Sequence, residues 1–207
     1  MAGYAGTRPA EDIVPELPAS VPRFGNALTR WVGRALLRWS GWRVTGNLPD
    51  ERRLLVIAAP HTSNWDWVIA MFAMLALGVR INYLIKDTLF VWPLSVLLRA
   101  SGGIPTDRSA PAGLVEEVAT RVCETEQVVM VITPEGTRSR VETWKTGFLR
   151  VAELARLPVV QVAWHYPDRL VHIGPVAELS GDHERDIARI RAWYRQFIGR
   201  NPENQSP

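Results

Sequence analysis

The chain has 207 residues, of which 47% are hydrophobic and 22% are charged, and its formal net charge is +3. These are ordinary values for a globular protein that is long enough to bury a sizeable core. The sequence has no basic stripe or nucleic-acid motif and no apolar run of about 18–20 residues, so we expect neither a nucleic-acid partner nor a transmembrane helix.

The first 22 residues contain four prolines among small and acidic residues, and they lack the apolar core of a signal peptide. We therefore predict a loosely ordered N-terminal arm over 1–22 and a single domain over 23–207. The one cysteine, Cys123, excludes an internal disulfide. It falls in a predicted helix, where we interpret it as a small core residue.

An amphipathic helix is predicted over 26–40, with Asn26 as its N-cap. Its apolar residues recur at three- and four-residue steps: Leu28, Trp31, Val32, Ala35, Leu36 and Trp39. A second stripe is basic: Arg30, Arg34 and Arg38. A tryptophan-rich stripe beside an arginine stripe suits an interfacial membrane helix, but it equally suits a surface helix packed on its own domain.

Strand-like and helix-like segments alternate over the rest of the chain. Runs of strand character lie at 42–45, 54–59, 81–85, 102–106, 128–133, 159–164 and 170–176. Helical patterns lie at 67–77, 93–100, 112–126, 147–156 and 182–199. The alternation predicts a single α/β domain, in which a mostly parallel mixed sheet has helices on both faces and follows the amphipathic helix.

A histidine and an aspartate lie at the junction of a strand and a helix. His61 comes just after the run 54–59, and Asp66 falls in the first turn of the helix that follows. Catalytic groups in open α/β sheets gather at the carboxyl ends of strands, and a histidine with a carboxylate partner can act as a general base. A purely structural interpretation is also open, with Ser63 as N-cap and Asp66 as its partner in a capping box.

Two later stretches add cations and polar groups near strand ends. Arg108 follows the short strand at 102–106 and offers a planar fork to a phosphate or carboxylate. The loop after the run 128–133 carries a compact set of candidate residues: Glu135, Gly136, Thr137 and Arg138. Each stretch alone could be a surface loop with a solvated ion pair. Together with the histidine they supply a base, its orienting acid and groups that bind an anion.

Four sequence blocks resemble, in order and approximate spacing, those of the glycerolipid acyltransferases, and in particular the bacterial 1-acyl-sn-glycerol-3-phosphate acyltransferases. The blocks are His61-x4-Asp66, Gly103–Arg108, Pro134–Ser139 and Leu157–Val160. The resemblance covers about residues 55–165.

This resemblance implies transfer of a fatty acyl group from a thioester of coenzyme A or acyl carrier protein to the hydroxyl of a lyso-lipid, as in phospholipid biosynthesis. His61 would take the proton of the attacking hydroxyl, and Asp66 would orient it, so no acyl-enzyme is expected. Arg108 would hold the anionic head of the acceptor, such as 1-acyl-glycerol-3-phosphate or another lyso-lipid. Glu135, Gly136, Thr137 and Arg138 would complete the pocket for the acceptor and the thioester carbonyl.

We expect no metal site, because the histidines form no cluster with ligand spacing and a single cysteine gives no soft site. The resemblance implies no cofactor, because the acyl thioester is a co-substrate. We expect a cytoplasmic protein that lies peripherally on the anionic inner face of the membrane, and acyl carrier protein is a candidate partner. Two alternatives stay open: an acyl thioesterase, in which water replaces the lipid hydroxyl, and a non-catalytic lipid-binding module.

Overall fold

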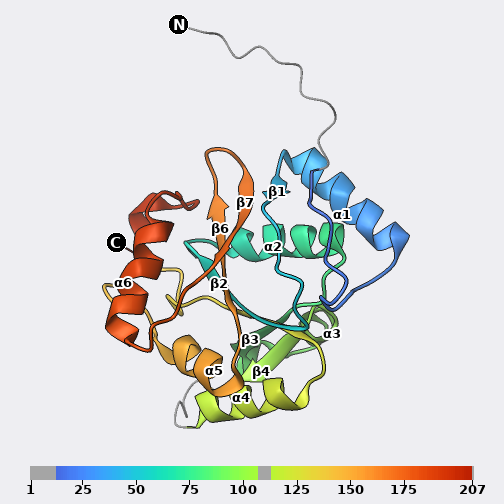
Figure 1. Ribbon diagram of the computed structural model, residues 1–207. Helices are drawn as coiled ribbons and strands as arrows, with labels where there is room; N and C mark the ends of the chain where they lie inside the picture. Colours follow the sequence, from blue (N-terminus) through green and yellow to red (C-terminus); the bar gives the residue numbers. More distant parts are fainter. Residues whose placement is uncertain (1–12, 107–112, 207) are drawn as a thin grey trace, which may run out of the picture.

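The computed structural model describes residues 13–106 and 113–206 as an α/β domain (Figure 1). The helices are α1 (Ala27–Ser40), α2 (Asn64–Leu77), α3 (Leu94–Ala100), α4 (Leu114–Glu124), α5 (Gly147–Ala155) and α6 (His183–Tyr194), with short 3-10 turns at Asp87–Leu89 and Pro202–Asn204. The strands are β1 (Arg43–Thr45), β2 (Arg53–Ala59), β3 (Asn82–Lys86), β4 (Gly103–Thr106), β5 (Val128–Ile132), β6 (Val159–His165) and β7 (Leu170–Val176).

These strands form one sheet in the order β1-β7-β6-β2-β5-β3-β4. All neighbouring pairs are parallel except β6 and β7, which are antiparallel. The predicted fold class is therefore confirmed. The parallel block β6-β2-β5-β3-β4 matters for function, because the carboxyl ends of its strands all reach the same edge of the sheet.

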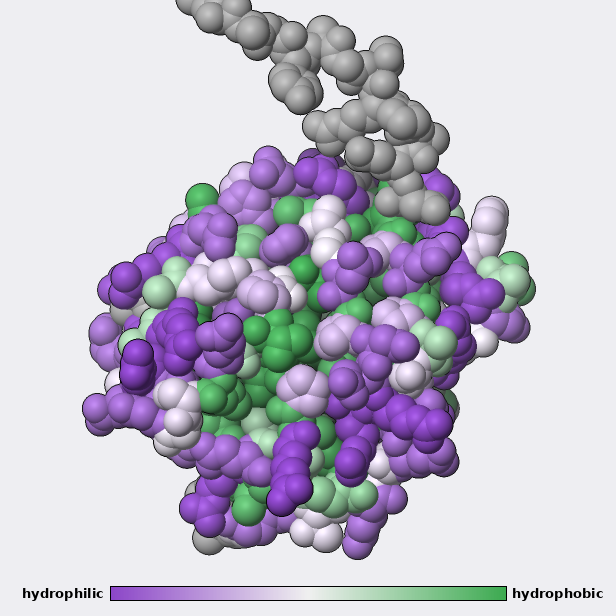
Figure 2. Space-filling model, viewed as in Figure 1, coloured by the Kyte–Doolittle hydropathy of each residue, from purple (hydrophilic) through white to green (hydrophobic). Residues whose placement is uncertain are grey.

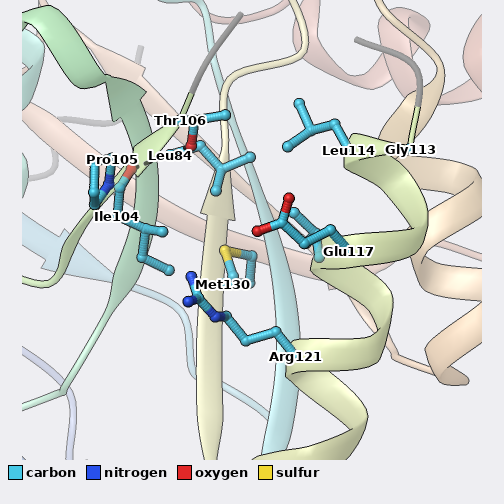
Figure 3. A pocket seen from close by; sticks show the side chains of 10 residues that line it. Leu84, Ile104, Pro105, Thr106, Gly113, Leu114, Glu117, Arg121 and Met130 are labelled. Atoms are coloured by element: carbon cyan, nitrogen blue, oxygen red, sulfur yellow. Dashed lines mark hydrogen bonds between the residues drawn. The ribbon is translucent and has the colours of Figure 1, made fainter. Parts of the chain in front are cut away.

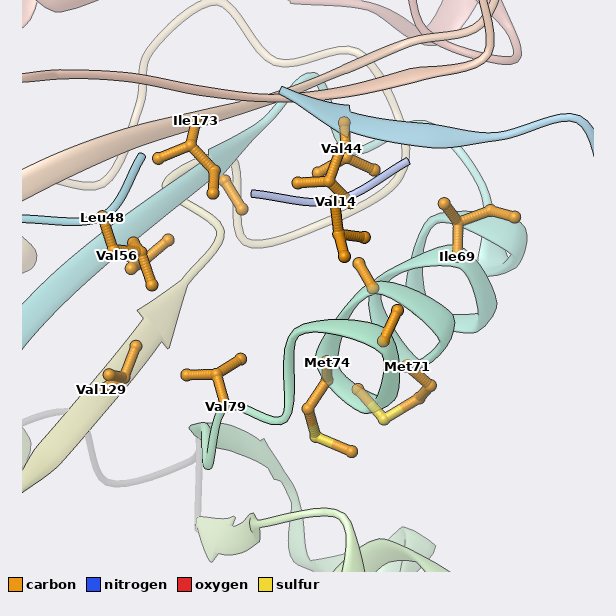
Figure 4. Close-up of a cluster of buried hydrophobic side chains, with 14 of the residues drawn as sticks. Val14, Val44, Leu48, Val56, Ile69, Met71, Met74, Val79, Val129 and Ile173 are labelled. Carbon is orange, nitrogen blue, oxygen red and sulfur yellow. The ribbon is translucent and has the colours of Figure 1, made fainter. Parts of the chain in front are cut away.

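The central strand β2 is buried on both faces of the sheet. Side chains alternate along a strand, so one set of its residues packs into one core cluster and the other set into the second. Leu54, Val56 and Ala58 belong to the cluster that includes residues of α1 and α2, part of which is shown in Figure 4. Leu55, Ile57 and Ala59 belong to the cluster that includes residues of α4, α5 and α6. Burial of both faces explains why β2 is an uninterrupted apolar run.

Helix α1 packs on α2 through a narrow face. Asn26 caps the helix as predicted, and Gly33 and Leu37 are its buried residues. The tryptophan-rich stripe points away from this contact, and Leu28, Trp31 and Trp39 remain 66%, 64% and 84% exposed. The helix therefore packs on its own domain through one face, and the described part of the chain leaves these three apolar side chains of the stripe exposed.

Three sequence predictions differ from the structure. Residues 13–22 form no helix or strand, but Val14 and Val21 are buried in the core, so this part of the predicted arm is packed; residues 1–12 lie outside the described residues. Cys123 is exposed on α4 rather than in the core, because the buried face of α4 is formed by Val118, Ala119 and Val122. The C-terminal helix ends at Tyr194, earlier than predicted.

No helix among the described residues is long and apolar enough to cross a bilayer. On the face shown in Figure 2, hydrophilic residues dominate the periphery, whereas hydrophobic residues gather in a band across the centre.

We expect Gly33→Ala to lower the free energy of unfolding by about 2 kcal/mol or more. Alanine normally stabilises a helix relative to glycine. At this position, however, a Cβ would lie 2.6 Å from the carbonyl carbon of Leu75 and would push α1 away from α2. Denaturant unfolding measures the change. Gly147→Ala is the control, since its Cβ would meet only a methyl group of Val115 at 3.3 Å. Equal stability of the two variants would contradict this account of the α1–α2 contact.

Candidate functional site

Three adjacent parallel strands bring the polar side chains of the site together. Strand β2 lies between β6 and β5. Strand β6 ends just before Tyr166, β2 ends shortly before His61, and β5 ends shortly before Glu135. The sheet thus brings Glu135 to His61 across 74 positions of the chain, and Tyr166 to Asp66 across 100 positions. The two sequence-predicted residues His61 and Glu135 do meet here, and Tyr166 is an addition that the sequence analysis did not identify.

His61 is paired with a fully buried carboxylate. Its Nδ1 lies 3.1 Å from Oδ2 of Asp66, whose side chain is 0% exposed, while the imidazole itself is 13% exposed. A carboxylate can only accept a hydrogen bond, so the pairing places the hydrogen of the neutral imidazole on Nδ1. Nε2 is then the nitrogen with a free lone pair, as a general base requires.

Asp66 also caps helix α2. Its Oδ2 accepts hydrogen bonds from the backbone N–H groups of Thr62 and Ser63, each at 2.9 Å, in addition to the bond from His61. Ser63 is the N-cap of a capping box in which Asp66 is the third helical residue. The capping-box interpretation is therefore confirmed, and the same carboxylate also contacts the imidazole of His61.

Tyr166 supplies the fourth hydrogen bond to Asp66. Its hydroxyl donates to Oδ1 at 2.6 Å. Burial, followed by the hydrogen bond to Asp66 and its negative charge, raises the pKa of Tyr166 far above its usual value, so the phenol keeps its proton. The sequence signal available for this residue was its place directly after β6, next to the strand that leads to His61.

Glu135 supports the backbone of the loop that carries His61. Its buried Oε2 accepts the backbone N–H of His61 at 2.6 Å, and its side chain also has a hydrogen bond with Ser206. Burial raises the pKa of Glu135 to about 7, and the charge of Asp66 adds to the effect, although the bonds from His61 and Ser206 act in the opposite direction. The structure thus places Glu135 behind His61 as a support for its backbone.

The remaining residues of this loop lie at the surface. Gly136 has φ +68°, and a Cβ there would lie 2.8 Å from Cε of Lys145, so both backbone conformation and space favour glycine. The N–H of Gly136 donates to the carbonyl of Thr133 at 3.0 Å. Thr137 and Arg138 are exposed. Arg108 lies outside the described residues.

The C-terminal segment after α6 closes over the histidine loop. Asn201 donates from its side chain to the carbonyl of Thr62 at 3.0 Å and from its backbone to the Thr62 hydroxyl at 3.2 Å. Arg200 lies over the half-exposed ring of Trp65, 5.1 Å from the ring centroid. Sequence reasoning missed these contacts, because they join residues nearly 140 positions apart through a segment with little regular structure.

Two cavities adjoin the sheet, and neither His61 nor Asp66 lines either of them. One, of about 470 Å³, reaches the site through Pro60 and Glu135, and its lining also includes Tyr194, Gln205 and Ser206. The other, of about 380 Å³, lies between α4 and strands β3, β4 and β5. Figure 3 shows its apolar side chains, which include Leu84, Ile104 and Met130, together with Glu117 and Arg121 of α4. Both volumes fall in the range of ligand sites.

We expect stability to fall as the pH rises from about 4.5 to about 7, and Glu135→Gln to remove this slope. In this window the unfolded chain releases the proton of Glu135 while the folded chain, with its pKa of about 7, retains it. Ionisation of this buried group therefore costs the native state on the order of 3 kcal/mol above pH 7. The amide of glutamine still accepts from His61 but does not titrate.

Denaturant unfolding of both proteins at several pH values measures this effect. The difference in unfolding free energy between Glu135→Gln and the unchanged protein should grow in favour of the variant between about pH 4.5 and 7. Parallel stability curves across the window would show that Glu135 ionises normally in the folded protein.

Comparisons with known proteins identify the family of the chain. The family model for the acyltransferase domain matches residues 42–165, which include His61, Asp66 and Glu135. No curated relative matches the chain by sequence. A solved structure, the 1-acyl-sn-glycerophosphate (LPA) acyltransferase PlsC from Thermotoga maritima, is similar with a TM-score of 0.61 and 19% identity, over 82% of this chain and 76% of that one. The likeness to PlsC shows a shared fold. The family model matches more than half of the residues of this chain, and the chain therefore belongs to the acyltransferase family.

Proposed function

We propose that this acyltransferase moves a fatty acyl group from an acyl thioester to the hydroxyl of a lyso-lipid such as 1-acyl-glycerol-3-phosphate. The observation that carries the proposal is the His61–Asp66 pair at the carboxyl edge of the sheet, with Nδ1 bonded to the carboxylate at 3.1 Å. The family match over residues 42–165 and the fold shared with a lysophosphatidate acyltransferase support the reaction class and the lipid acceptor.

The proposed reaction uses His61 as the general base. Its Nε2 removes the proton of the lipid hydroxyl as the oxygen attacks the thioester carbonyl. Asp66, which is bonded to Nδ1, stabilises the imidazolium that forms. When the tetrahedral intermediate collapses, the carbon–sulfur bond breaks and the imidazolium returns the proton to the thiolate. The products are a new ester and a free thiol, without an acyl-enzyme.

Cations near the edge of the sheet are proposed to hold the anionic head of the acceptor. Arg138 is exposed in the loop that begins with the buried Glu135. Arg108 lies outside the described residues, but it follows β4 in the sequence and is the second candidate for this role. Guanidinium groups suit the task, since they can bind a phosphate through two parallel hydrogen bonds.

A lipid acceptor requires access to a membrane surface, and we propose that α1 provides it. Its exposed Leu28, Trp31 and Trp39 would enter the interface, where tryptophan is favoured. Arg30, Arg34 and Arg38 on the same helix would attract anionic lipids. A peripheral position at the inner face of the membrane fits this arrangement.

We expect His61→Ala to lower acyl transfer by about 10²–10⁴-fold, because the base that takes the hydroxyl proton is lost. The measurement is release of free coenzyme A when acyl-coenzyme A is mixed with 1-acyl-glycerol-3-phosphate, with the lipid product identified by mass. The matched control is His183→Ala, since His183 is bonded to Glu153 on the surface. An unchanged rate in His61→Ala would remove this residue from the mechanism.

The same assay separates acyl transfer from the alternatives. The proposal requires thiol release to depend on the lyso-lipid, because Nε2 acts on its hydroxyl. Equal release without any acceptor would indicate a thioesterase, and no release with any lyso-lipid would leave a lipid-binding module.

We expect Trp31→Ser combined with Trp39→Ser to weaken binding to anionic phosphatidylglycerol vesicles by about tenfold or more, because two large apolar anchors are lost. Vesicle co-sedimentation measures the change. The exposed stretch from Leu89 to Leu97 keeps other apolar side chains, so weakening rather than abolition is expected. Leu154→Ser, which removes a 51%-exposed apolar side chain on α5, is the control. Equal binding by all three proteins would contradict a membrane role for α1.

A further inference from the structure

Tyr166 is the first residue beyond the part of the chain that matches the family model, yet it contacts the carboxylate at the centre of the site. Three donors converge on Oδ2 of Asp66: the Nδ1 of His61 and the backbone N–H groups of Thr62 and Ser63. On Oδ1, the described residues place one donor, the hydroxyl of Tyr166 at 2.6 Å. A fully buried carboxylate oxygen without a donor would be costly, so this bond is a strong constraint.

The ring of Tyr166 is held independently of the site. Trp42, which precedes β1 and is buried, packs edge-to-face on it with a centroid distance of 4.8 Å. The hydroxyl therefore approaches Asp66 from a ring fixed by another part of the sheet. Because burial and the nearby carboxylate raise the pKa of Tyr166, its phenol remains a donor at neutral pH.

We propose that Tyr166 is a positioning residue for the acyl transfer, acting through Asp66 on His61. This inference rests on the proposed function. The short bond fixes the plane of the carboxylate so that Oδ2 faces Nδ1, and it draws negative charge toward Oδ1. Without the phenol, the carboxylate would rotate more freely and present more negative charge to the imidazole. The imidazolium, which cannot act as a base, would then persist to higher pH.

Three other ionisable groups face this pair. His61 approaches from the loop after β2, Glu135 interacts with Asp66 from the loop after β5, and Arg200 lies near Tyr166 from the C-terminal segment. Removing the Tyr166 hydroxyl leaves His61 and Glu135 unchanged, whereas Arg200 loses its hydrogen bond with that hydroxyl. A nearby guanidinium disfavours the imidazolium, so an upward shift of the pH profile in such a variant reports on the lost bond to Asp66 rather than on Arg200.

The first test compares Tyr166→Phe with Tyr83→Phe. Tyr83 is the matched control, since its hydroxyl also joins a hydrogen-bond network, with Trp67 at 3.1 Å and Ser101 at 2.7 Å, but does not contact Asp66. We expect Tyr166→Phe to lower kcat by about tenfold, to leave KM for both substrates within about twofold, and to move the acid limb of kcat upward by about half a pH unit. Tyr83→Phe should leave kcat and the limb unchanged. A normal kcat and an unmoved limb in Tyr166→Phe would overturn the proposal.

A second test does not depend on activity. The imidazole Cε1–H resonance of His61, assigned by its loss in His61→Ala, is followed by NMR over a pH series in the same proteins. The transition should occur at higher pH in Tyr166→Phe than in the unchanged protein and Tyr83→Phe. Coincident transitions would overturn the proposal. If no lyso-lipid is acylated by the unchanged protein, the proposed function fails, while this titration still decides whether Tyr166 acts on His61.

Trp42→Phe provides a further variant should Tyr166→Phe fail to fold. It keeps the phenol but reduces the edge-to-face contact that holds the ring. A smaller shift in the same direction supports the proposal, and an absent shift contradicts it.

Discussion

The arrangement of the site depends on the desolvation of one carboxylate. Asp66 is fully buried, and an ionised carboxylate in that position is tolerated only if donors replace its lost water. Residues 13–106 and 113–206 supply four: two backbone N–H groups of its own loop, the imidazole of His61 and the phenol of Tyr166. The requirement to satisfy this carboxylate therefore determines the loop conformation, the start of helix α2 and the orientation of the imidazole together.

The sheet order makes this arrangement available. Because β2 lies between β6 and β5, its exit loop has a neighbour on each side at the same edge. One neighbour provides Tyr166, which fixes the carboxylate, and the other provides Glu135, which holds the backbone N–H of His61. The C-terminal segment then closes over the loop through Asn201. The loop that carries His61 and its partner Asp66 is thus held on three sides, and in the proposed mechanism Nε2 of His61 acts on the substrate. Rigid support of this kind is what a general base needs, since proton transfer is sensitive to small displacements.

The elements formed by local patterns could be predicted from the sequence. The apolar run of β2 and the 3.6-residue periodicity of α1 predicted their type, and the position of His61 at a strand exit predicted its place at the site. Contacts that depend on the packing of distant segments could not be predicted. The bond from Tyr166 needs the neighbouring position of β6, and the bonds from Asn201 come from an irregular tail. Val14 and Val21 are buried although the prolines around them indicated a loose arm. Cys123 shows the limit of residue-type reasoning, because a small apolar residue was predicted to be buried and is exposed.

The central claim is that the acyl group passes to the lipid without an acyl-enzyme, and the intact mass of the protein during turnover tests it. The protein is mixed with acyl-coenzyme A, first alone and then with 1-acyl-glycerol-3-phosphate, and the masses of protein and lipid are measured by mass spectrometry. A base without a protein nucleophile predicts an unmodified protein in both samples and a diacylated lipid only in the second. A protein heavier by one acyl group, formed before the lyso-lipid is added and lost on its addition, would contradict it.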